Sequence, residues 1–239
     1  MQPSFVTPPV PEQPRAVGSL LGDSLRRPGG RRALSVLSIV LFIAGISMFA
    51  YPVATDLYSR YQQSRLNSAF GDPELRHKYL THTIAIGDVL TKLQIPKIHL
   101  DVLVVEGTTP AALRAGAGHY PGTPLPGEPG NVGIAGHRTT FGRPFNHLDE
   151  MRPGDQVILT TPFKRFTYVA VQSFDGHGNP FITTPTDFHV VANVPGQSLL
   201  TLTSCNPKGS ARQRIVLRLQ LQPNLTEDVP QKKSKGAKP

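Results

Sequence analysis

The sequence contains little cysteine, tryptophan or charge. Cys205 is the one cysteine among 239 residues, and there is no tryptophan. A single cysteine excludes an intramolecular disulfide, so the folded part must be stable without one. Charged residues make up 17% of the chain and apolar residues 38%, which permits a modest core. Abundant proline (24) and glycine (22) favour a loop-rich β protein over a helical bundle.

The formal net charge is +9, and much of the excess lies near the two ends of the chain. The basic residues there are Arg15, Arg26, Arg27, Arg31, Arg32, Lys232, Lys233, Lys235 and Lys238. Proline, glycine and serine flank these clusters, and no aromatic residues are interleaved with them, so the pattern does not favour nucleic-acid binding. The histidines show no paired metal-ligand spacing, and the sequence predicts neither a metal site nor a cofactor.

Residues 33–54 form an apolar run without a charged residue. As a helix the run would span about 33 Å, enough for a bilayer core of about 30 Å. A cleaved signal peptide is the rival interpretation, but the run is long for one and its small-residue cleavage site is imperfect. More arginines precede the run than follow it, so the positive-inside rule predicts a cytoplasmic N-terminus and an extracellular C-terminal part.

The composition divides the rest of the chain. Residues 1–32 are predicted to be a disordered cytoplasmic tail, and residues 55–86 a juxtamembrane helix and linker that breaks at Gly71. Residues 87–222 are predicted to be one domain, and residues 223–239 a disordered tail.

Within 87–222, short apolar runs alternate with two long glycine- and proline-rich loops. The expected strands are residues 89–98, 100–105, 131–137, 156–161, 166–172, 198–204 and 215–221, and short helices are expected near 109–115 and 145–151. Without an evident parallel βαβ rhythm, the pattern predicts a mostly β domain, an antiparallel β-barrel with short helices.

Three reactive side chains stand at the ends of predicted strands. Cys205 follows the apolar strand 198–204, His137 ends another strand, and Arg214 begins the last one. A cysteine nucleophile needs a proton-transfer or ion-pair partner and a donor for developing negative charge. The plainer readings are a buried small thiol, a core histidine and a solvated arginine, and Arg212 is an alternative to Arg214.

Two stretches carry a family resemblance. TLTSCNPKGSARQRIVLR (201–218) and HYPGTPLPGEPGNVGIAGHRTTFGRPFNHLDEMRPGD (119–155) resemble the cysteine and histidine regions of sortases, most closely class E sortases of high-GC Gram-positive bacteria. The combined match covers roughly residues 87–222. Ser204 stands where the family usually has threonine, and it keeps the hydroxyl.

The resemblance implies a membrane-anchored cysteine transpeptidase. Cys205 would attack the Thr–Gly bond of a C-terminal sorting signal on a secreted protein, His137 would protonate the leaving amine, and Arg214 would bind the oxyanion. A cell-wall precursor amine would then release the protein, and class E members prefer L-A-x-T-G over L-P-x-T-G. Ser204, His119 and Tyr120 are candidate substrate contacts, although packing explains Tyr120 equally well.

Other functions stay open on the sequence alone. A pilin-polymerising sortase is one, but Asp72-Pro73-Glu74 lacks the aromatic third residue of the class C lid motif. A non-transferring extracellular cysteine peptidase and a non-catalytic β domain for adhesion or wall binding are the others.

Overall fold

The computed structural model describes residues 28–174 and 176–230. The predictions for residues 1–27 and 231–239 lie outside the described residues. By its internal contacts the chain forms two units, Met1–Tyr51 and Pro52–Pro239.

A long helix, α2 (Pro28–Phe70), contains the whole predicted anchor. Its stretch Arg31–Phe70 is the one helix among the described residues that is long and apolar enough to cross a membrane. This is consistent with a single-pass anchor. The prediction that residues 28–32 are disordered is wrong, because the helix already begins at Pro28. Proline suits the start of a helix, where its missing N–H would have no partner.

In the second unit, α2 continues from residue 52 to Phe70 and packs on the domain through one face. Thr55 and Ser59 are buried on this face, and Leu66 and Phe70 pack against an apolar cluster. The chain then turns at Gly71, and α3 (Pro73–Thr81) follows with Asp72 as its N-cap. The predicted helix and the break after Phe70 both occur, but much of the predicted linker is helical.

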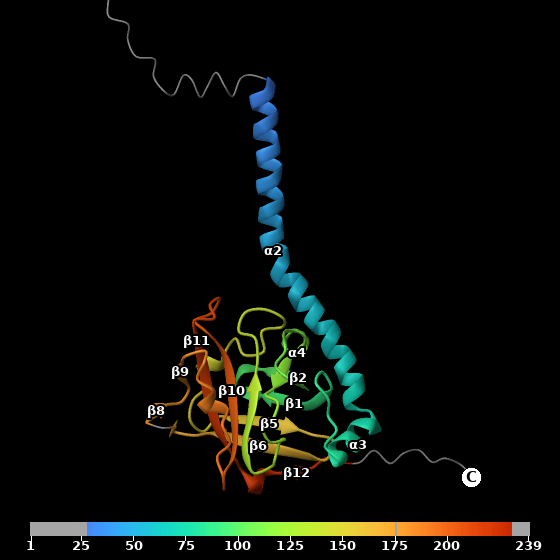
Figure 1. The fold of residues 1–239 in the computed structure, drawn as a ribbon, viewed down its shortest axis with the longest axis vertical. Helices are drawn as coiled ribbons and strands as arrows, with labels where there is room; N and C mark the ends of the chain where they lie inside the picture. The colour runs from blue at the N-terminus through green and yellow to red at the C-terminus, as the bar shows by residue number, and fades with distance from the viewer. Residues whose placement is uncertain (1–27, 175, 231–239) are drawn as a thin grey trace, which may run out of the picture. The chain divides into compact units, whose positions relative to one another are not determined.

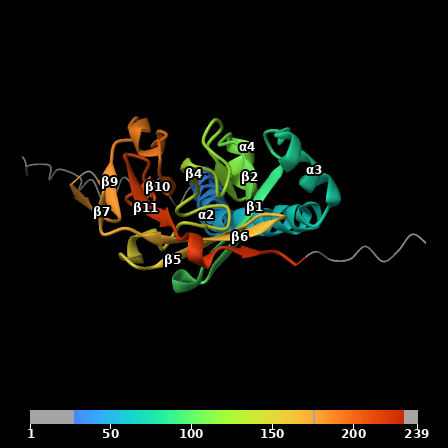
Figure 2. The same cartoon turned by 90° about the horizontal axis from the view of Figure 1, so that it is seen from below.

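The domain is built on a β-barrel (Figures 1 and 2). Its strands are β1 (Val89–Ile95), β2 (Leu100–Glu106), β3 (Ala117–His119), β4 (Gly130–Ala135), β5 (Gln156–Thr160), β6 (Lys164–Ala170), β10 (Ser198–Asn206) and β11 (Gln213–Leu221). They pair in the order β6-β5-β1-β2-β3-β4-β10-β11, and β11 pairs with β6 again, which closes the ring. The predicted β-barrel is confirmed.

Two pairs, β2–β3 and β4–β10, are parallel, where the sequence predicted antiparallel pairing. Parallel neighbours need a crossover connection. Helix α4 (Pro110–Ala115), capped by the Thr109 side chain, provides it between β2 and β3. This crossover is too short to be recognised as a βαβ unit from periodicity.

Short elements decorate the barrel. They are the 3-10 helices η1 (Pro96–Ile98), η2 (Leu148–Glu150), η3 (Phe188–Val191) and η4 (Pro223–Leu225), and the strands β7 (Ser173–Phe174), β8 (His177–Gly178), β9 (Phe181–Thr183) and β12 (Glu227–Asp228). Strand β12 pairs with the start of β6, where Glu227 and Asp228 face Arg165 and Lys164. The predicted disorder after residue 222 is therefore wrong for residues 223–230, and opposite charges across the two strands favour this pairing.

Alternation along the strands separates an inward from an outward face. The inward side chains of β4, β10 and β11 are Val132, Ile134, Leu200, Leu202, Ile215, Leu217 and Leu219, all members of the main core. Because neighbouring residues in a strand point to opposite faces, the odd residues of β4 and β10 and the even residues of β11 point outward.

Candidate active site

The three predicted catalytic residues come from adjacent strands at one end of the barrel. Cys205 lies near the end of β10, Arg214 near the start of β11, and His137 two residues beyond β4. Cys205 is an odd residue of β10 and Arg214 an even residue of β11, so both lie on the outward face. His137 follows the outward residues Gly133 and Ala135 at the same spacing of two. The fold therefore brings together three residues that are distant in sequence.

A regular ladder fixes Cys205 against Arg214. Strands β10 and β11 pair without interruption from Leu199–Gln220 to Asn206–Gln213, and Cys205 lies directly opposite Arg214. Such partners have Cβ atoms about 5 Å apart on the same face. Both side chains are partly exposed, so substrate can reach them.

The guanidinium of Arg214 is partly held by its own hairpin. Its Nη1 donates to the carbonyl oxygens of Ala211 and Gln213, both at 3.0 Å. Within the described residues, Nε and Nη2 make no hydrogen bond and are available as donors. Arg212, the alternative, is exposed and precedes the strand, whereas Arg214 has the position opposite the cysteine.

The parallel pairing of β4 with β10 brings His137 level with Cys205. Ala135 pairs with Thr203, two residues before His137 and Cys205 respectively. The Gly136 N–H donates to the Thr203 carbonyl at 3.1 Å. The buried Ser204 hydroxyl donates to the Gly136 carbonyl at 2.7 Å, so it ties the two strand ends together from the inward face.

The His137 ring is half-buried and packs on an aromatic neighbour. Its centroid lies 5.2 Å from that of the Phe141 ring, with the planes tilted by 38°. Burial lowers the pKa of His137 below its ordinary value of 6.5, and the positive charge of Arg114 lowers this pKa further.

Polar contacts brace the loop that follows His137. The Phe145 N–H donates to the His137 carbonyl at 3.1 Å. The buried Arg138 donates through Nε to the Asn146 carbonyl at 2.9 Å and pairs through Nη2 with Asp149 at 2.8 Å. Asp149 also lies 3.8 Å from Lys208 in the β10–β11 turn, so one carboxylate links the loops that follow His137 and Cys205.

The predicted substrate contacts have mainly internal partners. His119 is 1% exposed, and its Nδ1 lies 2.7 Å from Glu106 while its Nε2 lies near the Pro124 carbonyl and the Thr123 hydroxyl. The Tyr120 hydroxyl lies 2.9 Å from Thr203 Oγ1 on the outward face of β10. Contact of Ser204, His119 and Tyr120 with substrate stays a prediction, and Tyr120 is the partly exposed member.

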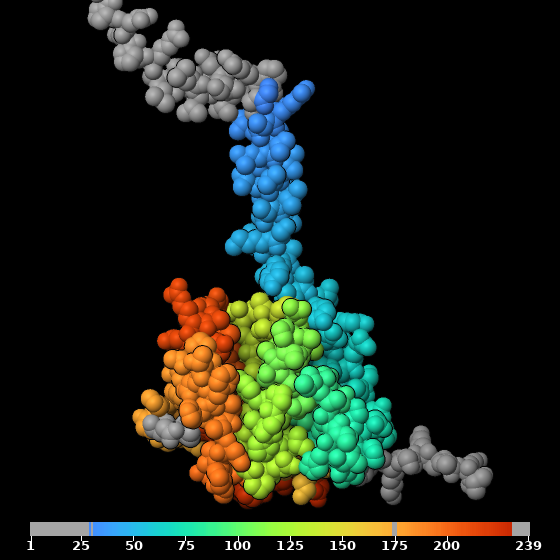
Figure 3. Space-filling model, in the orientation of Figure 1, coloured from blue at the N-terminus to red at the C-terminus, as the bar shows by residue number. Residues whose placement is uncertain are grey.

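Two buried polar residues missed by the sequence analysis hold the segment that covers the outward face. Asn131 donates to the carbonyls of Val190 and Ala192, and Arg218 donates through Nη2 to the Val190 carbonyl. These bonds fix η3 beside β4 and β11. Figure 3 shows the segment 176–197 (orange) on the surface of this unit. In the sequence, Asn131 and Arg218 are polar residues that alternate with apolar ones along predicted strands, and this alternation was the signal that could have identified them.

A small cavity lies within this segment. Its volume is about 170 Å³, and its lining includes Phe181, Ile182 and Thr183 of β9. Strand β9 pairs with β11, and Thr183, which lines the cavity, lies opposite Arg214.

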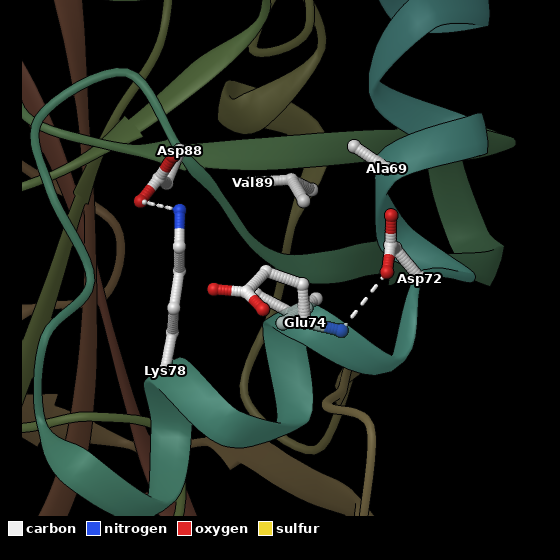
Figure 4. Close-up of a pocket in the computed structure, with 7 residues that line it drawn as sticks. Ala69, Asp72, Glu74, Lys78, Asp88 and Val89 are labelled. Carbon is white, nitrogen blue, oxygen red and sulfur yellow. Dashed lines mark hydrogen bonds and ion pairs between the residues drawn. The ribbon is translucent and has the colours of Figure 1, made fainter.

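A second cavity, of about 180 Å³, lies between α3 and β1 (Figure 4). Lys78 pairs with Asp88 across it at 2.8 Å, and Asp72 accepts from the Glu74 N–H. The Lys78–Asp88 pair joins α3 to the residue before β1. Asp72 acts here as the N-cap of α3. Among the described residues, no cluster of three or more His, Cys, Asp or Glu is arranged to hold a metal ion.

Comparison with known proteins gives a consistent set of matches. The sortase domain family model matches residues 93–222. Sortase SrtE1 of Streptomyces coelicolor is 27% identical over 80% of this chain, which spans 58% of that relative's length. The structure of Streptomyces avermitilis sortase E is 33% identical, with a TM-score of 0.53 over 60% of this chain and 93% of that one. A Clostridium perfringens sortase D5 transpeptidase structure is 26% identical, with a TM-score of 0.58 over 69% and 98%.

Proposed function

The chain belongs to the sortase family of transpeptidases, and from this premise we propose that it cleaves a sorting signal through Cys205 and transfers the protein to a cell-wall amine. One observation carries the proposal. Cys205 and Arg214 are paired residues on the outward face of β10 and β11, and His137 lies just beyond the end of the adjacent strand β4. We further propose that the domain is extracellular, that α2 is its membrane anchor, and that the signal is of the class E type, L-A-x-T-G.

The geometry supports a two-step acyl transfer. The Cys205 thiolate attacks the threonine carbonyl carbon, and the carbonyl oxygen becomes an oxyanion that Nε and Nη2 of Arg214 are placed to bind. When the C–N bond breaks, the His137 imidazolium donates its proton to the leaving glycine amine. A thioester to Cys205 and a neutral imidazole remain.

The second step runs in reverse order. The acceptor amine attacks the thioester carbonyl, His137 takes the proton that the amine loses, and the Cys205 thiolate leaves. A new amide bond replaces the thioester, and the enzyme returns to its starting charge state. The neighbouring Phe141 and the partial burial of His137 limit access of water to the imidazole ring.

The test uses the full chain in detergent with L-A-x-T-G and L-P-x-T-G peptides and diglycine as acceptor. We expect a diglycine adduct, faster with L-A-x-T-G, and complete loss of product in Cys205→Ala. Asn67→Ala, on an exposed position of α2, is the matched control and should keep full activity. If the domain is extracellular as proposed, a membrane-impermeant maleimide should label the wild type on intact cells. Cys205 is the one thiol in the sequence, so the label reports its location.

Each alternative predicts a different product. Hydrolysed peptide without adduct at high diglycine would indicate a peptidase, and transfer to a pilin lysine but not to diglycine would indicate a pilin polymerase. Adduct formation that persists in Cys205→Ala would refute the proposed nucleophile.

A further inference from the structure

The second half of α2 contacts the turn that carries Phe141, beside the candidate active site. Asp56 Oδ1 accepts the Gly142 N–H at 3.1 Å, and Oδ2 pairs with Arg143 Nη2 at 2.8 Å. Ser59 packs directly under Gly142, where an added Cβ would lie 2.7 Å from the Ser59 hydroxyl. One carboxylate thus binds two successive residues of the turn.

This turn has an unfavourable backbone. Phe141, Gly142 and Arg143 have φ values of 50°, 76° and 49°. Glycine adopts such values freely, but a residue with a side chain loses about 1 kcal/mol or more there. Two such residues on either side of one glycine persist only when surrounding contacts hold them, and the contacts from Asp56 and Ser59 are placed to do so.

The held conformation places Phe141 at the centre of a cluster. Its ring lies 5.2 Å from the His137 ring, 6.3 Å from the Tyr58 ring in an edge-on arrangement, and 6.0 Å from the Arg114 guanidinium. Tyr58 comes from α2 and Arg114 from α4. Phe141 therefore connects α2 to the catalytic imidazole.

The helix is itself fixed to the barrel, so it can act as a support. The Gln63 side chain donates to the carbonyls of Leu103 and Ala115 and accepts the Leu103 N–H at 2.7 Å. These bonds join α2 to β2 and to the end of α4. On the same helix, Asp56 lies about two turns and Tyr58 about one and a half turns before Gln63.

We propose that Asp56 and Tyr58 are positioning residues for the transpeptidation step: by holding the turn 141–143 they set the orientation and solvent exposure of the His137 ring. The inference rests on the proposed function. It also implies that the helix following the anchor is part of the active unit and not a passive tether. The exposed ion pair to Arg143 contributes little alone, and the added bond to the Gly142 N–H makes the contact specific.

The charged and titratable groups around His137 define what a titration should show. Arg114 faces it from α4, Cys205 and Arg214 come from β10 and β11, and Asp56 and Arg143 form the ion pair beyond Phe141. When the turn relaxes, Phe141 leaves the imidazole and water replaces it. Because burial is the main cause of the lowered pKa, release of the turn should raise the pKa of His137.

The experiment compares Asp56→Ala and Asp56→Asn with the wild-type full chain in detergent. Asp56→Ala removes both contacts, while Asp56→Asn keeps an acceptor for Gly142 and is nearly isosteric. We expect kcat to fall about tenfold in Asp56→Ala and less in Asp56→Asn, with KM for the peptide nearly unchanged, because alignment and not binding is lost. Tyr58→Ala should lower kcat and Tyr58→Phe should not. Glu74→Gln, which also removes one acidic charge near α2, is the control.

A second readout separates positioning from simple destabilisation and does not need activity. NMR titration of labelled histidine, assigned with a His137→Gln sample, should show the His137 midpoint moving to higher pH in Asp56→Ala and not in Glu74→Gln. Unchanged kcat and an unchanged midpoint in both Asp56 variants would overturn the inference and leave the proposed function intact. If the wild type makes no adduct, the proposed function fails, and the titration still decides whether α2 holds the turn.

Discussion

The two halves of the candidate site are held in different ways. Cys205 and Arg214 sit in an uninterrupted antiparallel ladder, where main-chain hydrogen bonds fix one residue opposite the other. His137 stands at the start of a loop, and side-chain contacts from Arg138, Phe141 and, more remotely, Asp56 define its surroundings. The ladder half depends on local pairing, and the loop half depends on residues from several elements.

The difference has a chemical meaning. In the proposed mechanism Cys205 and Arg214 keep a constant relation through both steps, which a ladder provides. In the proposed mechanism the imidazole donates a proton in one step and accepts one in the next, so its pKa should lie near the working pH. Burial of His137 and the positive charge of Arg114 lower this pKa.

The largest expected effect comes from removing the Arg214 side chain. Arg214→Ala removes the donors opposite Cys205 and should lower kcat/KM about 10²-fold or more, as loss of an oxyanion donor does. Arg214→Lys keeps the charge but not the planar fork and should recover only part of the loss. Arg212→Ala, two residues earlier, is the control, and an equal loss there would favour the alternative arginine. The measurement is steady-state adduct formation.

A smaller effect should follow from removing the hydrogen bond that joins the end of β10 to the residue before His137. Ser204→Ala removes the hydroxyl that binds the Gly136 carbonyl and leaves that buried acceptor without its partner, at a cost of about 1–3 kcal/mol. We expect lower thermal stability and a severalfold lower kcat, while Ser204→Thr should keep both close to wild type. Unchanged melting and activity in Ser204→Ala would show that the backbone pairing alone suffices.

The smallest effect should come from changing the charge beside His137. Arg114→Gln removes the positive charge beside His137, so the pKa of His137 should rise toward its ordinary value. Since the imidazolium is then retained to higher pH, the alkaline loss of activity attributable to His137 should move upward. NMR titration and a pH profile of kcat/KM measure the shift. A downward shift would contradict the assigned direction of the Arg114 effect.

The ladder half was largely predictable from the sequence. Alternating apolar residues indicated the last two strands, and the motif residues at their ends identified Cys205 and Arg214. The parallel pairing of β4 with β10 was not predictable from periodicity, since alternation gives a strand and not its partner or direction. His137 was found through its motif, while its alignment with Cys205 depends on that pairing.

The supports of the loop half were not predictable. Asp56, Ser59 and Gln63 recur at helical spacing, but polar residues on a helix next to a membrane span normally indicate a solvated surface. Phe141 and Arg143 at positive φ carry no compositional signal, because only Gly142 in that turn favours such a backbone. Tertiary contacts decide both features, and a single sequence does not display them.

The parallel register of β4 and β10 also constrains how such a chain can change in evolution. His137 and Cys205 each lie two residues beyond a paired position, so one inserted residue within either strand would turn a reactive side chain toward the core. Length changes in the connecting segment 171–197 outside β9 and η3 leave that register untouched. We therefore expect natural variation in chain length to accumulate in that segment, while the two strands keep a constant residue count.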